Sequence, residues 1–337
     1  MKFLTTHIDH DSSTCLLQNG VIKLHIPEER LSRIKRDDYP LLSIQKAVEL
    51  FGFSTDDTFL ASSVSCNHSN LHDSTTWLRK ATKQSDIQIE NQINSSVFLD
   101  NQNHHLYHAS TGFFNSGFEE AIVIVADGGG ALVDQGSSAK DHHDFDMQEI
   151  YSVYHCSYPD KIERIKTVVF KDDISAGILF EVAAVKLGFT RWDAGKVMGL
   201  APYGNPVDIK IVKNTEGIPY DIICDGTDED LACGVQNYVQ NKILGLMQES
   251  LESIQSRNIV MTGGVGLNCV ANYWYLDNLP KDVKLYCEPM STDDGISVGS
   301  AQLLYRNKTK DTTIRPLKTL YLGAKYDIDI YDGERCT

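Results

Sequence analysis

The feature that most constrains the fold is a pattern of an apolar strand, a short turn and a second apolar strand, which occurs twice. In the first copy, "FLTTHI" and "STCLLQNGVIKLHI" flank the polar turn 10–13, "HDSS", and Asn19-Gly20 is a strong signal for a β-hairpin. The second copy, 121–136, reads "AIVIVADGGGALVDQG", with an aspartate and three glycines in its turn. Two such hairpins in one chain predict a duplicated architecture.

The rest of the sequence alternates helical and strand-like patterns, which indicates an α/β protein. Helical spacing of apolar residues is found at 40–53, around the histidines near 105, at 175–189, at 229–257 and after residue 295. Short strand-like runs lie at 58–64, 96–99, 258–262 and 283–287. By contrast, the segment "RWDAGKVMGLAPYGNP" contains too many glycines and prolines to form one regular element.

Length and composition limit the class of protein. A chain of 337 residues with 42% hydrophobic content can build sizeable cores, in about two domains. Its longest apolar run, "AIVIVA", has six residues, far short of the ~20 that cross a bilayer. Eight cysteines without a CxxC pair, and a start that lacks the apolar core of a signal peptide, predict a reducing, cytoplasmic setting.

The net charge of −15 argues against direct binding to nucleic acid, because phosphate binding depends on Lys and Arg. A basic partner subunit could still bring nucleic acid to the chain. The acidity is equally well explained by solubility.

Four residues form a candidate metal site. His104 and His108 are four apart in a helical segment, so both imidazoles would lie on one helix face. Asp127 ends an apolar strand, and Asp293 opens a turn after another strand. Two nitrogen and two oxygen ligands suit a divalent transition metal such as iron, manganese or zinc. Taken singly, each aspartate could instead cap a helix or turn.

Glycine turns predict a nucleotide site. The order strand, Gly-Gly-x-Gly, helix in "MTGGVGLN", 261–268, is a recurring way to hold phosphate. A second turn follows Asp127, and a third contains a lysine that can neutralise phosphate. Neither a Walker A loop nor a Rossmann fingerprint is present. The candidate nucleotide-contacting residues are Gly128, Gly129, Gly130, Lys196, Gly199, Gly263, Gly264 and Asn268.

The motifs "HDSSTCLLQNG", "PEERLSRIKR", "HHLYHA", "DAGKVMGLAPYG", "GGVGLN" and "STDDGISVG" occur in the order found in the nodulation and antibiotic O-carbamoyltransferases. The chain resembles that family from residue 1 to about residue 325. The family's catalytic domain is similar to the tRNA threonylcarbamoyl-adenosine synthesis proteins. The resemblance implies a bilobal actin/hexokinase/Hsp70-like fold, in which two RNase H-like lobes enclose a nucleotide and metal cleft. We expect lobes at 1–120 and 121–305, and a tail at 306–337.

The resemblance also implies residue roles. His104, His108, Asp127 and Asp293 would bind the metal, with iron expected and manganese or zinc as alternatives, and the glycines, Lys196 and Asn268 listed above would contact the nucleotide. Asp11 would be an active-site group. His10 would be a general base for the acceptor hydroxyl, a role that Asp193 could share. In this sequence "DGGG" replaces a turn in which relatives often carry Gly-x-Gly followed by an acid, so the contacts of Gly130 stay open.

The implied reaction transfers a carbamoyl group from carbamoyl-adenylate, made from ATP and carbamoyl phosphate, to a hydroxyl of a small molecule or nucleotide. Magnesium can accompany the ATP. Family members continue past "YLGAKYD" into an adenylate-forming domain, whereas this sequence stops at Thr337. We therefore expect a separate adenylate-forming subunit or a truncation. Two alternatives stay open: a nucleotide-binding scaffold without chemistry, and threonylcarbamoyl transfer to tRNA.

Overall fold

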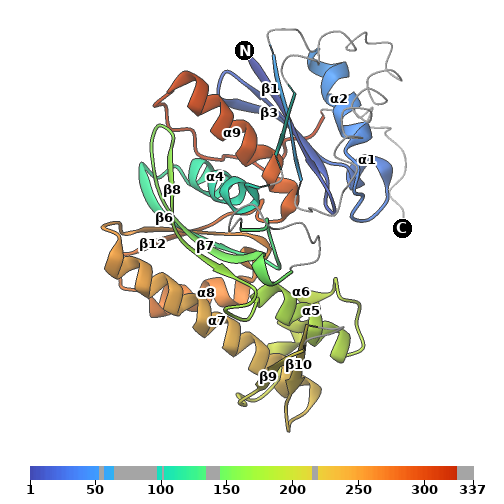
Figure 1. Ribbon diagram of the computed structural model, residues 1–337, viewed down its shortest axis with the longest axis vertical. Helices are drawn as coiled ribbons and strands as arrows, with labels where there is room; N and C mark the ends of the chain where they lie inside the picture. The colour runs from blue at the N-terminus through green and yellow to red at the C-terminus, as the bar shows by residue number, and fades with distance from the viewer. Residues whose placement is uncertain (53–56, 64–96, 101, 134–144, 215–218, 325–337) are drawn as a thin grey trace, which may run out of the picture.

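A computed structural model describes residues 1–52, 57–63, 97–100, 102–133, 145–214 and 219–324 (Figure 1). The fold is mixed α/β, as the sequence predicts. The first sheet is formed by β1 (Lys2–Ile8), β2 (Ser13–Gln18), β3 (Val21–Pro27), β4 (Thr58–Ser63) and β5 (Val97–Asp100). The second is formed by β6 (Glu120–Ala126), β7 (Glu149–Ser157), β8 (Lys161–Val169), β11 (Asn258–Thr262) and β12 (Lys284–Cys287).

The two sheets share one topology. The first has the strand order β3-β2-β1-β4-β5, and the second has β8-β7-β6-β11-β12. In each sheet, neighbours among the first three strands of this order are antiparallel, and the last two run parallel to the third strand, which is β1 or β6. The expected duplication is therefore seen in the strand order of the described residues.

The first predicted hairpin is confirmed and the second is not. Asn19 and Gly20 both have positive φ, 51° and 76°, as a two-residue turn between β2 and β3 requires. In the second copy, the antiparallel partner of β6 is β7, which begins at Glu149. Leu132 forms an isolated bridge to Gln148, and residues 134–136 lie outside the described part of the chain. The glycines after Asp127 thus form a loop rather than a tight hairpin turn.

Helices cover both faces of the first sheet. On the outer face, Leu4, Leu16 and Leu24 pack against α2 (Leu41–Phe51), which follows the short helix α1 (Glu29–Ser32). On the inner face, Phe3 and Leu17 pack against α9 (Ile296–Thr309). Although α9 is the last described helix of the sequence, it therefore belongs with the first sheet (Figure 1).

The second sheet is also covered on both faces, which explains why "AIVIVA" is apolar throughout rather than alternating. Ala121, Val123 and Val125 pack against α4 (His104–Ser116), and the residues between them pack on the opposite core. That opposite core contains α5 (Ala176–Lys186), α7 (Asp228–Ser253) and α8 (Cys269–Asn278). Helices α4 and α9 contact each other between the two sheets (Figure 1).

Helix ends follow their local sequence signals. Gly117 ends α4 in the left-handed conformation, with φ 76°, and Thr227 and Asp230 form a capping box at the start of α7. The glycine-rich segment forms only α6 (Ala194–Leu200) and the 3₁₀ turn η3 (Ala201–Tyr203), as its composition predicts. Three further 3₁₀ turns, η2 (Phe145–Met147), η4 (Gly264–Leu267) and η5 (Asp293–Gly295), and a small sheet of β9 (Lys210–Lys213) and β10 (Tyr220–Ile223) complete the described elements.

Across the described helices, none is both long enough and apolar enough to cross a membrane.

Candidate active site

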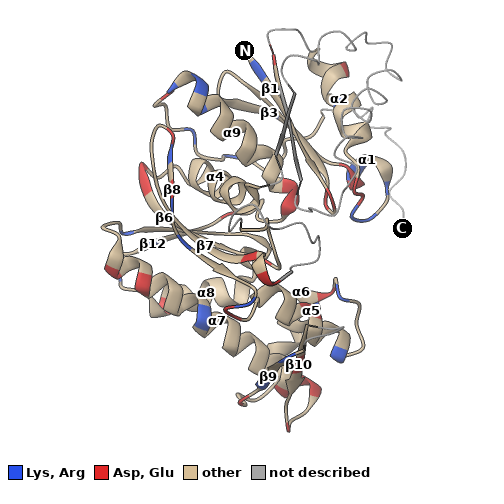
Figure 2. Ribbon diagram, viewed as in Figure 1, with Lys and Arg blue, Asp and Glu red and all other residues tan. Residues whose placement is uncertain are grey.

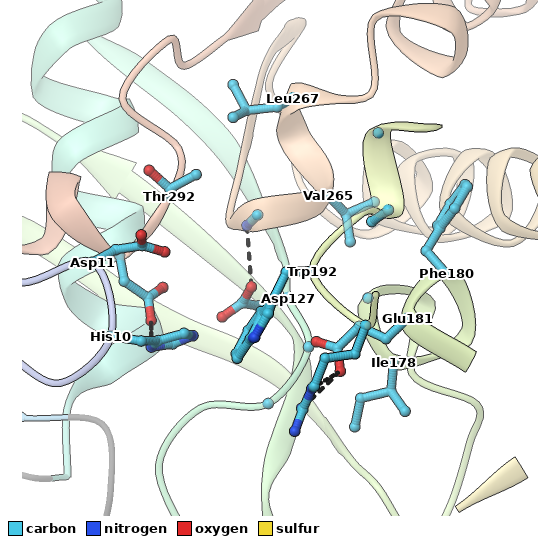
Figure 3. Close-up of a pocket in the computed structure, with 18 of the residues that line it drawn as sticks. His10, Asp11, Asp127, Ile178, Phe180, Glu181, Trp192, Val265, Leu267 and Thr292 are labelled. Carbon is cyan, nitrogen blue, oxygen red and sulfur yellow. Dashed lines mark hydrogen bonds and ion pairs between the residues drawn. The ribbon is translucent and has the colours of Figure 1, made fainter. Parts of the chain in front are cut away.

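Strands from both sheets end at one cavity, in which Asp127 lies between His10 and Asp11 on one side and Ile178 and Glu181 on the other (Figure 3). The segments after β1, β6, β11 and β12 all contribute to its wall. This is where a sheet of parallel strands normally presents its binding residues. The lining residues used below are His10, Asp11, Arg36, Asp127, Gly128, Gly129, Trp192, Gly264, Asn268 and Asp293.

The four residues expected to bind a metal converge at this cavity. One ligand atom from each of His104, His108, Asp127 and Asp293 lies within 4.8 Å of all the others. His104 Nε2 lies 3.0 Å from Asp127 Oδ2, and His108 Nε2 lies 3.3 Å from Asp293 Oδ1. The histidines come from the first two turns of α4, whereas the aspartates follow β6 and β12, so the cluster joins segments distant in the sequence.

Charge inside the cluster is balanced by one imidazole. Burial lowers the pKa of His104, but Asp293 and Asp127 outweigh burial and raise it to about 9. Burial raises the pKa of both aspartates, but the neighbouring histidines outweigh it and hold both carboxyl pKa values below their usual range. Two buried carboxylates need a nearby cation, and a proton on His104 or a metal ion supplies one.

The cluster fits a divalent transition metal. His104 Nε2 and His108 Nε2 face each other at 3.2 Å, so the two ring nitrogens could share a proton or hold one cation. The Gly264 N–H donates to Asp127 Oδ1 at 3.1 Å, an interaction drawn as a dashed line in Figure 3. That bond leaves Oδ2 of Asp127 for the cluster. Two imidazole nitrogens and two carboxylate oxygens are a donor set that iron, manganese and zinc all accept.

The predicted phosphate-contacting glycines divide into two groups. Gly128, Gly129 and Gly264 line the cavity, so their backbone is open to a ligand. Gly130 and Gly263 do not line it, and both are needed for packing. A Cβ on Gly130 would lie 2.8 Å from the His104 ring, and one on Gly263, where φ is 84°, would collide with the Ala126 carbonyl.

Asn268 and Ser175 shape the same wall. Asn268 caps α8 by accepting the Ala271 N–H at 3.0 Å, and its side chain also lines the cavity. Ser175 caps α5 by accepting the Ile178 N–H, and its hydroxyl donates to the Gly128 carbonyl at 2.7 Å. The Asp127–Gly129 loop is therefore held against the N-terminus of α5, where free N–H groups favour an anion.

Lys196, Asp193 and Gly199 are not among the residues that line the cavity. Lys196 Nζ lies 3.0 Å from Asp193 Oδ1 and 5.1 Å from the Phe189 ring centroid, with 57% of its side chain exposed. Asp193 also accepts hydrogen bonds from Thr190. Both charges are thus used within the start of α6 and the segment before it. A Cβ on Gly199 would meet no atom within 4 Å.

His10 and Asp11 do line the cavity. His10 Nδ1 is buried 3.4 Å from Asp293 Oδ2, which leaves Nε2 as the ring nitrogen available to a ligand. Burial lowers the pKa of His10, but Asp293 and Asp9 outweigh burial and raise it. Asp11 pairs with Arg36 at 3.0 Å, yet burial outweighs this partner and raises the pKa of the Asp11 carboxyl.

Two further residues at the site were not singled out from the sequence. Trp192 lines the cavity between the guanidinium groups of Arg36 and Arg191, which lie 4.2 and 4.6 Å from its ring centroid. His7 in β1 is fully buried beside Asp293, and burial lowers its pKa to about 3, so it is neutral. A histidine inside an apolar strand just before "HDSS" was the available signal.

A family model and two nodulation proteins are similar to this chain. The family model of the carbamoyltransferase N-terminus matches residues 61–221 and 221–302. Nodulation protein NolNO of Sinorhizobium fredii is 23% identical over 95% of this chain and 50% of its own length. Nodulation protein NolO of Bradyrhizobium diazoefficiens is 23% identical over 66% of this chain and 41% of its own. The chain thus spans about half the length of these relatives.

Solved structures support the fold. Full-length HypF in its phosphate- and nucleotide-bound form superposes with a TM-score of 0.56 at 15% identity, over 91% of this chain and 56% of HypF. HypF of T. kodakarensis gives a TM-score of 0.54 at 14% identity, over 93% of this chain and 49% of its own. The family match covers most of the sequence and confirms the resemblance read from the motifs. The chain belongs to the carbamoyltransferase N-terminal family of transferases.

Proposed function

We propose that this chain carries the acceptor side of an O-carbamoyltransferase, which moves a carbamoyl group from carbamoyl-adenylate to a hydroxyl of a small molecule or modified nucleotide. The observation that carries the proposal is the cluster of His104, His108, Asp127 and Asp293, two of which, Asp127 and Asp293, line the cavity, in a chain of the carbamoyltransferase family. Each sheet with its helices would be one RNase H-like lobe, with α9 in the first lobe, and the cavity between them would be the cleft.

In this proposal the adenylate phosphate binds at the glycine loops. Gly128 and Gly129 expose backbone to the cavity, and α5 begins beside their loop, whereas the N–H of Gly264, which also lines the cavity, already donates to Asp127. Backbone N–H groups at such positions bind anions without needing a side chain. Lys196 pairs with Asp193 and does not line the cavity, so its contact with the phosphate stays a prediction.

His10 is placed to act as the general base. Its Nδ1 faces Asp293 and its Nε2 is available to the cavity. We propose that Nε2 accepts the proton of the acceptor hydroxyl as the hydroxyl oxygen bonds to the carbamoyl carbon. The bond from that carbon to the adenylate phosphate oxygen breaks, so AMP leaves and the carbamate ester remains. Asp11, held by Arg36, would bind the acceptor beside His10.

A divalent iron, manganese or zinc ion would be held by His104, His108, Asp127 and Asp293, and when bound it polarises a phosphate or carbonyl oxygen. The donor itself is made from ATP and carbamoyl phosphate, with magnesium accompanying ATP. We propose that an adenylate-forming partner performs that step, on the strength of the family resemblance.

The test supplies carbamoyl-adenylate to the purified chain together with a panel of sugar, polyketide and nucleoside alcohols, and detects the carbamate ester by mass spectrometry. His10→Ala should lower turnover by about 10²–10⁴-fold, as loss of a general base does. His155→Ala is the matched control, since His155 pairs with Glu120 on the surface. Undiminished turnover by His10→Ala would overturn the assignment of the base.

The nucleotide-binding scaffold is distinguished in the same experiment. Because the chain spans about half of its relatives, binding without chemistry is the alternative to be tested. Tight binding of AMP in calorimetry, with no carbamate formed on any alcohol, would favour the scaffold. A threonylcarbamoyl product on tRNA would instead favour the other alternative, threonylcarbamoyl transfer.

A further inference from the structure

His7 has an arrangement that its burial alone does not explain. It lies on β1, the central strand of the first sheet, where its backbone is paired with Ser13 of β2 and Ser62 of β4. The side chain is fully buried, with 0% exposure. Within the described part of the chain, neither of its ring nitrogens has a hydrogen-bond partner. A buried polar group without a partner destabilises a fold, so such groups usually serve a function.

The charged group that faces the His7 ring is the Asp293 carboxylate, through its Oδ2 atom. His7 Nε2 lies 3.9 Å from Asp293 Oδ2, and His10 Nδ1 lies 3.4 Å from the same oxygen. The other oxygen, Oδ1, faces His104 at 3.7 Å and His108 at 3.3 Å. The Asp293 carboxylate therefore lies between two pairs of imidazoles. His104 and His108 face its Oδ1, and His7 and His10 face its Oδ2. His7 does not line the cavity, so a substrate in the cavity would not touch it.

The distance between His7 and Asp293 is set by rigid connections. Figure 2 shows acidic positions at the N-terminal end of α9, where η5 meets the first sheet. Ser13 Oγ donates to the Asp294 carbonyl at 2.6 Å, and Thr5 Oγ1 donates to the Ser297 carbonyl at 2.5 Å. These bonds tie β1 and β2 to the turn that carries Asp293. The first sheet thus holds His7 in place against the cluster.

We propose that His7 is a positioning residue of the metal centre, which donates a hydrogen bond from Nε2 to Asp293 Oδ2 and so turns Oδ1 toward the ion. With the two backbones held by the bonds above, a side-chain rotation that shifts either atom by about 1 Å brings Nε2 and Oδ2 within hydrogen-bond range. The inference rests on the proposed metal site. It extends that site from α4 and the strand ends to the centre of the first sheet. Partners of this kind orient metal ligands and raise metal affinity.

The experiment titrates the full-length chain with Co²⁺ in calorimetry and records the Co²⁺ absorption spectrum at saturation. His7→Leu removes the donor while filling the space, and His7→Gln keeps an N–H donor near the position of Nε2. We expect His7→Leu to raise the Kd for Co²⁺ by about 10–100-fold without lowering the melting temperature, because the buried unpartnered ring is gone. His7→Gln should stay within about threefold of the unmodified chain, and the control His155→Leu should match it.

Each outcome decides the proposal. A positioning role is supported if His7→Leu binds Co²⁺ more weakly, His7→Gln binds it about as tightly as the unmodified chain, and the Co²⁺ spectrum is the same in all of them. Equal affinity in His7→Leu overturns it, and a changed spectrum overturns it by making His7 a direct ligand. If the unmodified chain binds neither Co²⁺ nor Mn²⁺, the metal part of the proposed function fails and takes this inference with it. If it binds metal and His7→Leu binds equally well, only the inference fails.

Discussion

Glu288, directly after β12, is a buried acid outside the cavity whose environment favours its uncharged form. Burial raises its pKa to about 7, although the Met290 N–H at 2.9 Å and the Asn115 amide at 3.2 Å both donate to Oε1. Its other oxygen lies 3.2 Å from the Tyr286 hydroxyl. The Tyr286 hydroxyl donates to that oxygen, so all three hydrogen bonds favour the charged carboxylate, and burial outweighs them in favour of the neutral form.

This residue makes stability depend on pH. Because the folded pKa is about 7 and the ordinary value is 4.5, the contribution of Glu288 to stability is full below about pH 4.5 and is lost as the pH rises through 7. Glu288→Gln stays neutral, so it should be more stable than the unmodified chain at pH 8, by about 3 kcal/mol, and nearly equal at pH 4.5. Urea denaturation at both pH values measures the difference. The exposed Glu249→Gln is the control, and an equal shift at both pH values would contradict the assignment.

At the same scale, the sequence located the metal-cluster residues but not every charge around them. Asp127 and Asp293 were recognisable because an acid directly after a buried strand lies at the sheet edge where ligands bind. His104 and His108 were recognisable from helical spacing. For Lys196 the phosphate contact stays a prediction, because a glycine–lysine pair does not fix where the side chain points on a seven-residue helix, and the lysine pairs with Asp193.

At the scale of elements, the cluster depends on close packing of α4 on α9. Gly299 in α9 lies against the Tyr107 carbonyl of α4, and a Cβ at that position would collide with this carbonyl and with Thr111. Helix α4 carries both histidines, and Asp293 lies one turn before α9. A bulkier residue at 299 must therefore push the two helices apart and open the cluster.

Gly299→Ala should lower the free energy of unfolding by about 1–3 kcal/mol, as overpacking does, and weaken metal binding in the same variant. Gly245→Ala in α7 is the matched control. A Cβ there meets nothing within 4 Å, so alanine should stabilise the helix by about 0.5–1 kcal/mol. Chemical denaturation compares the two. If the Gly299→Ala chain is as stable as the Gly245→Ala chain, the close contact of α4 and α9 at Gly299 does not contribute to stability as proposed.

Elements with strong local signals were predicted best, as the 26-residue helix α7 and the hairpin at Asn19-Gly20 show. The four-residue strands β9 and β10 were not predicted, whereas β5 and β12, which are equally short, were. The partner of β6 was misjudged for another reason: the glycines after Asp127 indicate a turn, but 21 residues lie between Asp127 and the strand that pairs with β6, and local sequence does not encode that pairing.

At the scale of the whole molecule, two sheets of one topology place their strand ends at a common cavity. The first sheet contributes His10 and Asp11, and the second contributes Asp127 and the glycine loops. The helices between the sheets supply the histidines. This division explains why the repeated strand pattern in the sequence predicted the architecture, whereas the way the two halves meet, including the role of His7, required the three-dimensional structure.

The central claim is that His104, His108, Asp127 and Asp293 hold one divalent metal ion. The most direct test is elemental analysis, after dialysis, of the chain reconstituted with iron, manganese or zinc, alongside His108→Ala and Asp293→Asn. The account predicts one ion per unmodified chain and a small fraction of that in either variant. Unmodified chain that retains no ion, or variants that retain as much metal as it does, would contradict the account.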